Sequence, residues 1–343
     1  MSREWKCRLA LGLWGITLLL VALVHGLGQR WWFTAFFVYS PQLLWPMAML
    51  GLAALVWSTS RKLALLLLGT AFFLAGPVME WRTHGKIHAP LAAGDPDVLR
   101  VMTCNRGQSY GHTLASFISK QQPDVLAIQD AGSPQAFVPG GPEYQSFAHR
   151  AQVGEFVLLS RHPVIGTRLV VCQATLGDQS LMSWFKGARF VVQFHDHQVA
   201  IYTVHMPSPR HELHAYRPST LGRPQQRRRM FRFWEEQQVL DEEMLKQIEA
   251  DPLPVIVLGD WNLPALGPLY RRLTRRLADA HACAGTGYGF SFPGDVWFAA
   301  AWGGRWLRLD DVLCSKEWEP LECIVEPKSE SQHSPVAAVL RWR

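Results

Sequence analysis

The sequence predicts an α+β protein in which three transmembrane helices precede one folded domain. Three observations support this fold class: long apolar runs within residues 1–94, short strand-like runs within residues 95–343, and a change in charge between these two parts. The strand-like runs combine hairpin-type meanders with βα units, which favours an α+β sandwich over a doubly wound parallel sheet. About 250 residues are enough for one such domain to bury a complete core.

The membrane anchor is predicted from three apolar runs. The first, residues 9–27, carries no formal charge, and at about 1.5 Å per residue it just crosses a hydrocarbon core of roughly 30 Å. The second span is expected over residues 42–57 and the third over 63–79, with Trp57 and Trp81 at interfacial positions. A cleaved signal peptide is the alternative interpretation of the first run, but no clear small-x-small cleavage motif follows it.

Basic residues indicate how this anchor is oriented. Three of them precede the first run, Arg61 and Lys62 separate the second from the third, and only Arg30 lies between the first two. The positive-inside rule therefore places the N-terminus in the cytoplasm. Three crossings then place the domain on the extracytoplasmic side of a multi-pass cell-membrane protein, joined by a short tether over residues 83–95.

The net charge of +6 resides in the anchor. Residues 1–94 hold eight basic and two acidic side chains, whereas residues 95–343 hold 26 of each. A domain that coats nucleic acid carries excess positive charge on its folded part, so nucleic acid is disfavoured as a partner. Five of the six cysteines lie in the domain without a zinc-like spacing, and their pairing and the oligomeric state stay open.

Strands and helices of the domain follow from apolar patterning. Runs rich in Val, Leu, Ile and Phe, bounded by turn residues, predict strands over residues 99–105, 124–129, 155–160, 168–172, 189–194, 198–205, 254–259, 308–315 and 335–341. Helical periodicity predicts helices over 112–120, 224–249 and 268–277.

Polar side chains occur where these strands end. In chain order they are Asn105, Asp130, His205, Asp260 with Asn262, Asp310 with Asp311, and Gln332 with His333 before the last strand. A single strand that ends in Asp usually marks a turn or a cap. Six such ends in order indicate instead that the groups converge on one sheet edge, where an oxygen-rich set suits Mg²⁺ or Mn²⁺ rather than zinc.

The ordered set resembles the endonuclease/exonuclease/phosphatase superfamily. The motifs that carry the resemblance are VMTCN (101–105), PDVLAIQD (123–130), LLSRHPV (158–164), VHMPSP (204–209), VLGDWNLPALGPLY (257–270), RLDDVLCS (308–315) and SQHSPVAAVL (331–340). The resemblance implies two packed mixed β-sheets flanked by helices, a four-layer sandwich over residues 95–343. With its anchor over residues 1–94, the chain is similar to a membrane-bound bacterial subgroup that includes glycopeptide-resistance-type proteins. Members of that subgroup are inferred to act on phosphorylated substrates at the outer face of the membrane.

The resemblance also implies catalytic roles. Asp260 would orient or deprotonate the attacking water, and Asn262 would contact the phosphoryl oxygens. His333, paired with Asp310, would stabilise developing negative charge, since a carboxylate favours the imidazolium form. His205 would add a further donor to the phosphate.

The expected metal ligands depart from the family's pattern. Asn105, Asp130 and Gln332 occupy the metal positions. Asp130 stands where the family has Glu and is shorter by roughly 1.5 Å, and Gln332 stands where it has Asp and offers only a neutral oxygen. Asp311 could add a carboxylate, but adjacent strand residues face opposite sides, so we expect it to point away.

Two further segments keep alternative interpretations. Seven arginines between residues 210 and 232 form either a clamp for diphosphate or anionic lipid head groups or a solvated helix face. The aromatic segment 290–306 either contacts lipid chains or belongs to the core, with Trp297, Phe298, Trp302 and Trp306 as the first candidates for lipid contact.

These observations predict a membrane-anchored phosphohydrolase that depends on Mg²⁺ or Mn²⁺. It would cleave a phosphoester or diphosphate in a phosphorylated small molecule or lipid-linked substrate beside the bilayer. Because only the metal positions depart from the family pattern, a catalytically weakened module that binds phosphorylated ligands is the main alternative. A nuclease is the second alternative.

Overall fold

The structure is a computed structural model. It describes residues 2–83, 95–107, 113–132, 141–174, 182–217, 219–220, 223–294, 304–327 and 331–343. Nearly all of the predicted tether, and Trp297, Phe298 and Trp302 of the aromatic segment, lie outside the described residues.

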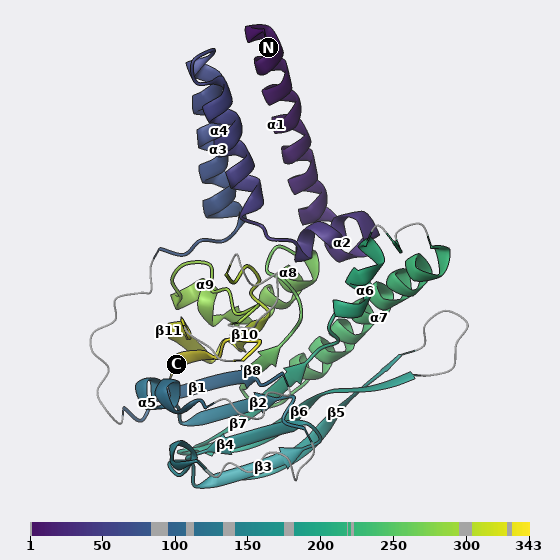
Figure 1. Cartoon of the computed structure of the whole chain (residues 1–343). Coiled ribbons are helices and arrows are strands. Elements are labelled where there is room, and N and C mark those ends of the chain that lie inside the picture. Colours follow the sequence, from purple (N-terminus) through teal and green to yellow (C-terminus); the bar gives the residue numbers. More distant parts are fainter. Residues whose placement is uncertain are drawn as a thin grey trace.

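The N-terminal part is a group of apolar helices (Figure 1). They are α1 (Arg3–Gly26), η1 (Gly28–Arg30), α2 (Trp32–Tyr39), α3 (Leu44–Val56) and α4 (Arg61–Phe73), which continues as the π-helical turn η2 (Leu74–Val78). Two helices, Arg3–Gly26 and Arg61–Val78, are long and apolar enough to cross a membrane. The pair α2 and α3, bent by 84°, gives a third candidate if both belong to one span.

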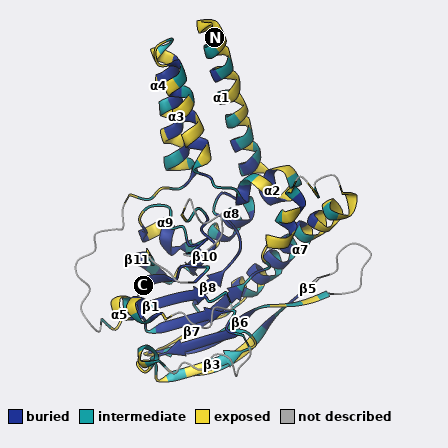
Figure 2. Ribbon diagram, in the orientation of Figure 1, coloured by how far each residue is buried: buried dark blue, intermediate teal, exposed yellow. Residues whose placement is uncertain are grey.

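These helices expose apolar side chains as a membrane-spanning helix does. Ile16 and Phe72 are 62% and 83% exposed, and Figure 2 shows exposed positions along α1, α3 and α4. In Figure 1 the N-terminus and the turn between α3 and α4 lie at the same end of the helices, away from the domain, whereas α2 lies across their other end.

The domain contains two six-stranded sheets. The first has the order β11 (Trp318–Val325), β12 (Val336–Trp342), β1 (Val98–Asn105), β2 (Val125–Gln129), β4 (Phe156–Ser160), β3 (His149–Val153). The second has the order β5 (Val164–Ala174), β6 (Met182–Phe194), β7 (His197–His205), β8 (Val255–Asp260), β10 (Asp310–Cys314), β9 (Ala278–Asp279). Both are mixed, because β1 pairs with β2 and β7 with β8 in parallel while the other pairs are antiparallel. The predicted α+β sandwich of two mixed sheets is confirmed.

The main core lies between the sheets. Val101, Ile201, Ile256 and Val312 are buried there, contributed by strands of both sheets. The parallel strands are apolar on both faces because helices cover the outer sides, and β8 is buried along its whole length. Strand pairing therefore fixes where each of these strands ends, and with it the position of the polar residue that follows.

Helices cover the outer face of each sheet. They are α5 (Ala115–Gln121) and η3 (Pro142–Tyr144) on the first sheet, and α7 (Pro224–Glu249) and α8 (Pro268–Thr274) on the second. The short helices α6 (Arg210–Leu213) and η4 (His214–Tyr216) pack beside α7, and Ala280 of α9 (Ala280–Ala284) belongs to the core between the sheets. The observed bounds of α7 are the predicted ones. The helix has a proline in its first turn, where a backbone N–H would have no acceptor within the helix, so the missing N–H of proline costs nothing there. Its buried face, which includes Leu240, Met244 and Ile248, packs on the second sheet.

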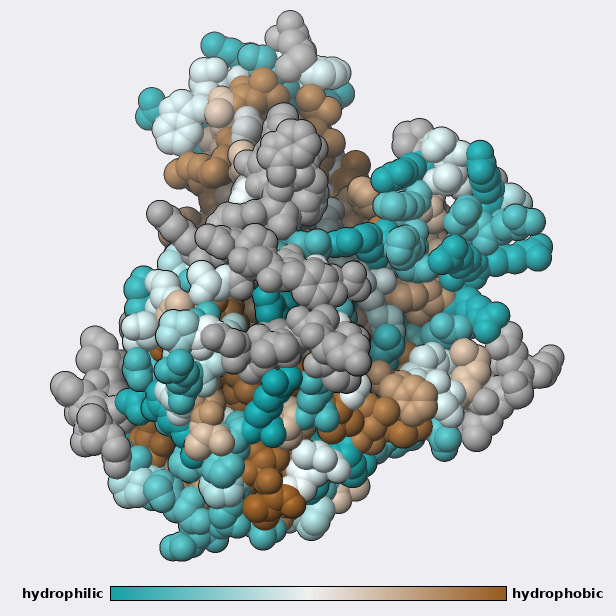
Figure 3. Space-filling view, turned by 60° about the horizontal axis from the view of Figure 1, so that its bottom comes forward, coloured by the Kyte–Doolittle hydropathy of each residue, from teal (hydrophilic) through white to brown (hydrophobic). Residues whose placement is uncertain are grey.

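The N-terminal helices pack directly against the domain. One apolar cluster contains residues of these helices, such as Val38 and Tyr39, together with Met230 and Trp234 of α7 and Leu266 from the loop before α8. The N-terminal helices and the domain therefore share a buried interface. Figure 3 shows a hydrophilic arm that projects beside the apolar N-terminal helices, in the region of α6 and the first turns of α7.

Candidate active site

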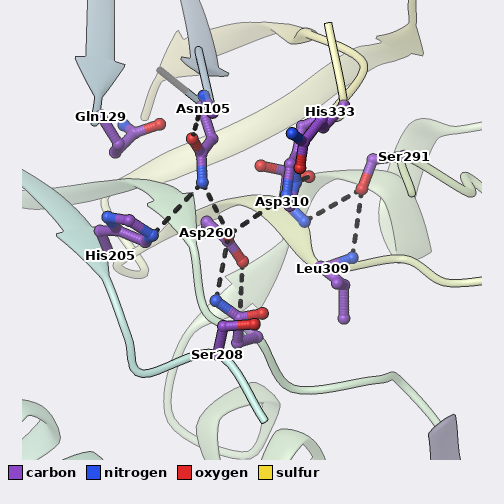
Figure 4. A network of polar contacts seen from close by, with 12 residues as sticks. Asn105, Gln129, His205, Ser208, Asp260, Ser291, Leu309, Asp310 and His333 are labelled. Carbon is purple, nitrogen blue, oxygen red and sulfur yellow. Dashed lines mark hydrogen bonds and ion pairs between the residues drawn. The ribbon is translucent and has the colours of Figure 1, made fainter. Parts of the chain in front are cut away.

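Strand pairing brings the predicted polar residues to one edge of the sandwich. His205 and Asp260 are the last residues of the parallel strands β7 and β8 and are paired in register. Asp310 begins the antiparallel strand β10 opposite Asp260. Asn105 ends β1 in the other sheet, so both sheets contribute to the site. Figure 4 shows Asn105, His205 and His333 arranged around Asp260.

Asp260 is the centre of this network. Its Oδ2 accepts hydrogen bonds from Asn105 Nδ2 at 2.9 Å and from Asn262 Nδ2 at 3.1 Å, and its Oδ1 accepts one from the Asn262 backbone N–H at 2.8 Å. Burial raises the pKa of Asp260, and the positive charge of His333 opposes that rise. A buried carboxylate held in this way is suited to orient a water molecule and to accept its proton.

His333 and Asp310 form a buried ion pair. His333 Nδ1 donates to Asp310 Oδ2 at 2.8 Å, and His333 Nε2 lies 3.7 Å from Asp260 Oδ2. Burial alone would lower the pKa of His333, but the carboxylates of Asp310 and Asp260 raise it to about 9. His333 is therefore an imidazolium at neutral pH and presents its Nε2–H beside Asp260.

The position of Asp310 is fixed by a residue that the sequence patterns did not indicate. Ser291 Oγ accepts hydrogen bonds from the backbone N–H groups of Leu309 and Asp310, both at 3.2 Å. The ring of Phe292 packs against His333 with centroids 4.9 Å apart. These contacts hold both members of the ion pair.

His205 has its own carboxylate partner. Its Nδ1 donates to Glu155 Oε1 at 3.1 Å, and its Nε2 lies 3.4 Å from Asn105 Nδ2. Burial lowers the pKa of His205, but the hydrogen bond to Glu155 and the charge of Asp260 outweigh burial and raise it. Glu155 lies in the turn between β3 and β4, outside every motif, so sequence reasoning missed it.

Two of the expected metal residues lie apart from this network. Gln332 Oε1 accepts a hydrogen bond from Arg210 Nη2 at 2.7 Å, so its amide oxygen is directed to that guanidinium. Asp130 follows β2 with a φ of 52°, and its charge helps to raise the pKa of His205. No hydrogen bond or ion pair of Asp130 is found among the described residues, and it is not one of the three residues that could hold a metal ion together.

The donor set fits a hard divalent cation. Asp260, Asp310 and His333 each offer a ligand atom within 4.8 Å of the others. Because His333 is protonated, the oxygens are the available ligands, and Asp310 Oδ1 is buried without a hydrogen-bond partner among the described residues. Asn105 Oδ1 accepts a hydrogen bond from the Gly107 N–H at 2.9 Å. Carboxylate and amide oxygens of this kind suit Mg²⁺ or Mn²⁺.

Two residues of the loop at Asp260 have a backbone conformation that few residue types adopt. Gly259 has a φ of 146°, and a Cβ there would lie 2.1 Å from the Val204 carbonyl oxygen, so only glycine fits. Asn262 has a φ of 50°, a left-handed conformation that asparagine tolerates better than most residues. The GDWN motif therefore encodes the shape of the loop as well as its chemistry.

Asp311 faces away from the site, as strand alternation predicts. Its Oδ1 accepts a hydrogen bond from Tyr270 at 3.1 Å and lies 3.7 Å from Arg308 Nε. It belongs to a separate buried cluster in which Arg308 also pairs with Asp279 at 2.9 Å. Asp311 therefore adds no ligand beside Asp260.

Comparisons with solved structures found chains that are similar to this one. An endonuclease/exonuclease/phosphatase from Bacteroides vulgatus matches at 14% identity with a TM-score of 0.51, covering 72% of this chain and 99% of its own. A 3′ phosphatase from Neisseria, solved with a product DNA hairpin, matches at 15% identity with a TM-score of 0.49, covering 71% of this chain and 100% of its own. Among curated proteins, none matches this sequence.

The sequence also matches a family model directly. The model of the endonuclease/exonuclease/phosphatase family aligns with residues 104–333, which extend from the end of β1 to His333. This range contains all eight residues that the sequence assigned to the site. Because the model matches most of the chain and the fold agrees with it, this protein belongs to the endonuclease/exonuclease/phosphatase family.

Proposed function

We propose that this protein is a membrane-anchored, divalent-metal-dependent phosphohydrolase that cleaves a phosphoester or diphosphate. Members of the family, which includes phosphatases and nucleases, are typically metal-dependent hydrolases. The observation that carries the proposal is the buried group of Asp260, Asp310 and His333, whose ligand atoms lie within 4.8 Å of one another. This group combines a base, an imidazolium and oxygen ligands at a single sheet edge.

Each residue contributes a separate part of the reaction. Asp260 orients the attacking water and takes its proton, which its raised pKa favours. Asn262 and His205 donate hydrogen bonds to the phosphoryl oxygens. His333, kept protonated by Asp310, neutralises the negative charge that develops as the leaving oxygen departs. A cation held by Asn105 and the carboxylate oxygens of the cluster would supply additional charge neutralisation at the phosphoryl group.

The place of the site beside the anchor supports a substrate at the membrane surface. The loop that carries Asn262 contacts Tyr39 of α2, and α2 lies across the domain end of the apolar helices. Arg210 lies next to His333 through its bond to Gln332, and its charge lowers the pKa of His333 slightly. We infer that a lipid-linked phosphate or diphosphate head group enters at this edge, where guanidinium groups bind phosphate well.

We also infer that the domain lies on the extracytoplasmic side. The basic residues of the N-terminus and those of the turn between α3 and α4 occur at the end of the helices farthest from the domain. The positive-inside rule assigns that end to the cytoplasm. Cysteine labelling with a membrane-impermeant reagent tests this, because labelling of the exposed Cys283 in intact cells is expected and protection of Cys283 would contradict it.

Hydrolysis by the purified full-length protein in detergent tests the proposal. With Mg²⁺ or Mn²⁺, the protein should release phosphate from a lipid diphosphate or a generic phosphoester, and Asp260→Ala and His333→Ala should each abolish release. Asp196→Asn, a charge removed from an exposed hairpin tip, is the matched control and should retain full activity. Activity that survives both site substitutions would rule out the assigned mechanism. A DNA-nicking assay run in parallel distinguishes a nuclease.

One observation favours a second candidate, a weakened module that binds phosphorylated ligands. Gln332 is engaged with Arg210 instead of the carboxylate cluster, so the cation would have fewer anionic ligands. The double variant Asp130→Glu with Gln332→Asp restores the family's residues and separates the two candidates. Turnover that appears only in this variant identifies the binding module, whereas turnover in the natural protein identifies the enzyme.

A further inference from the structure

We propose that the membrane anchor completes the active site, with the hydroxyl of Tyr39 acting as a positioning group for Asn262. Tyr39 is the last residue of α2 and lies 223 positions before Asn262 in the sequence. This inference rests on the proposed function of the loop at Asp260, and it assigns to an anchor residue a part in organising that loop.

The contact itself is direct and buried. Tyr39 Oη donates a hydrogen bond to the Asn262 carbonyl oxygen at 2.8 Å, and the two residues are 7% and 4% exposed. A buried carbonyl has no water to replace a lost donor, so removal of the hydroxyl leaves it unsatisfied. Asn262 also has a left-handed backbone conformation, with a φ of 50°, which costs energy in residues other than glycine. The hydrogen bond from Tyr39 helps to hold the backbone of Asn262 in this conformation.

Asn262 transmits this constraint to the catalytic carboxylate. Its backbone N–H and its Nδ2 donate to the two oxygens of Asp260, and Nδ2 also donates to the Met206 carbonyl oxygen at 2.9 Å. Rotation of the peptide that carries the Asn262 carbonyl therefore changes the position of the amide beside Asp260. Tyr39 thus acts on the reaction through Asn262 without touching the reacting atoms.

Tyr39 is itself held in a fixed position. Its ring stacks on Trp234 of α7 with centroids 5.6 Å apart and an interplanar angle of 21°. The chain before α2 is pressed against the end of the same loop, since a Cβ at Gly28 would lie 2.1 Å from Pro268 Cδ. A Cβ at Gly267, the residue before Pro268, would lie 2.5 Å from Gln29 Nε2. The anchor therefore contacts the loop both at Asn262 and at the start of α8.

Measurements of kcat with the full-length protein in detergent test this inference. Tyr39→Phe removes only the hydroxyl and keeps the stacked ring, and we expect kcat to fall about tenfold while KM changes little. Tyr288→Phe is the matched control, because Tyr288 also donates to a carbonyl of the N-terminal helices, that of Ala75 at 2.9 Å, whereas the Asn262 carbonyl receives its hydrogen bond from Tyr39. The control is expected to retain kcat.

A double-mutant cycle distinguishes positioning from general stability. Asn262→Gly removes the amide while keeping the backbone conformation, since glycine adopts a positive φ without strain. In this background Tyr39→Phe should change kcat less than about twofold, because the side-chain amide that Tyr39 positions beside Asp260 is gone, although the backbone carbonyl and N–H remain. Equal effects of Tyr39→Phe in both backgrounds, or equal losses for Tyr39→Phe and Tyr288→Phe, would overturn the inference.

A readout that needs no turnover keeps this test separate from the proposed function. Hydrogen exchange of the peptide that contains residues 260–264 should become faster in Tyr39→Phe and stay unchanged in Tyr288→Phe. Absence of hydrolysis in the natural protein contradicts the proposed function alone. Unchanged exchange in Tyr39→Phe contradicts the positioning role whether or not the protein hydrolyses a substrate.

Discussion

The charge state of His333 can be tested by replacing Asp310 with Asn. The substitution keeps the shape of the side chain and removes the negative charge 2.8 Å from His333 Nδ1. Asp310 is the main influence that raises the pKa of His333 from 6.5 to about 9 against the effect of burial. Each unit by which the substitution lowers the pKa of His333 corresponds to about 1.4 kcal/mol of lost imidazolium stabilisation.

The expected result is a shift in the pH dependence of hydrolysis. Because the raised pKa keeps His333 protonated up to about pH 9, kcat of the natural protein should decline only as the pH rises through that value. In Asp310→Asn the decline should move to lower pH, because burial then disfavours the imidazolium and the Asp260 charge alone remains to oppose that effect. If the pKa of His333 falls by about two units or more, the imidazolium becomes a minor species at pH 7.5 and kcat should fall about tenfold.

The assay is a pH–rate profile of the full-length protein under saturating substrate, recorded with the melting temperature of each variant at each pH. Asp196→Asn, an exposed change of the same chemical type, should leave the profile unchanged. An alkaline decline that stays near pH 9 in Asp310→Asn would refute the assignment of that decline to His333.

Three other predictions concern stability and the second histidine. The raised pKa of His333 contributes stability that is complete below pH 6.5 and is lost as the pH rises through about 9. The free energy of unfolding of the natural protein, measured by denaturant titration, should therefore fall over this pH range. The His333→Gln variant should lack this fall. Glu155→Gln should lower the pKa of His205, whose hydrogen bond to Glu155 raises it, and increase KM roughly threefold at pH 7.5; an unchanged KM would remove His205 from phosphate binding. Gly259→Ala places a Cβ 2.1 Å from the Val204 carbonyl oxygen, and the melting curve should show a loss of about 3 kcal/mol or more.

Much of the site could be predicted because the change from apolar to polar residues marks in the sequence where each strand ends. His205, Asp260 and Asp310 each adjoin an apolar run, and strand pairing places such residues on one edge. Asn105 and His333 join them because β1 and β12 are neighbours in the other sheet. Local patterning therefore predicts that these groups converge, and the resemblance to the family supplies their catalytic roles.

The remaining site contacts depend on tertiary structure. Glu155 lies in a hairpin turn, and only the packing of the two sheets brings it to His205. The bond between Arg210 and Gln332 joins residues 122 positions apart and directs the amide away from the carboxylates. The contact of Tyr39 with the loop at Asp260 needs the bend between α2 and α3, which composition does not encode.

Edge strands account for the main differences between the predicted and the observed fold. The strand β3 (His149–Val153) was not predicted because its residues are largely polar and half-exposed at a sheet edge. The strand β11 contains Pro320 and glutamates, and its pairing with β12 shifts register next to Pro320. Proline is tolerated at such an edge, where one side of the strand needs no hydrogen-bond partner.

Phosphate release by the full-length protein, with and without added Mg²⁺ or Mn²⁺, tests the central claim most directly. That claim is that strand ends from both sheets form one metal-dependent phosphohydrolase site around Asp260. It predicts metal-dependent release by the natural protein and none by the Asp260→Ala, His333→Ala double variant. Equal release by the double variant, or release unaffected by a chelator, would contradict it.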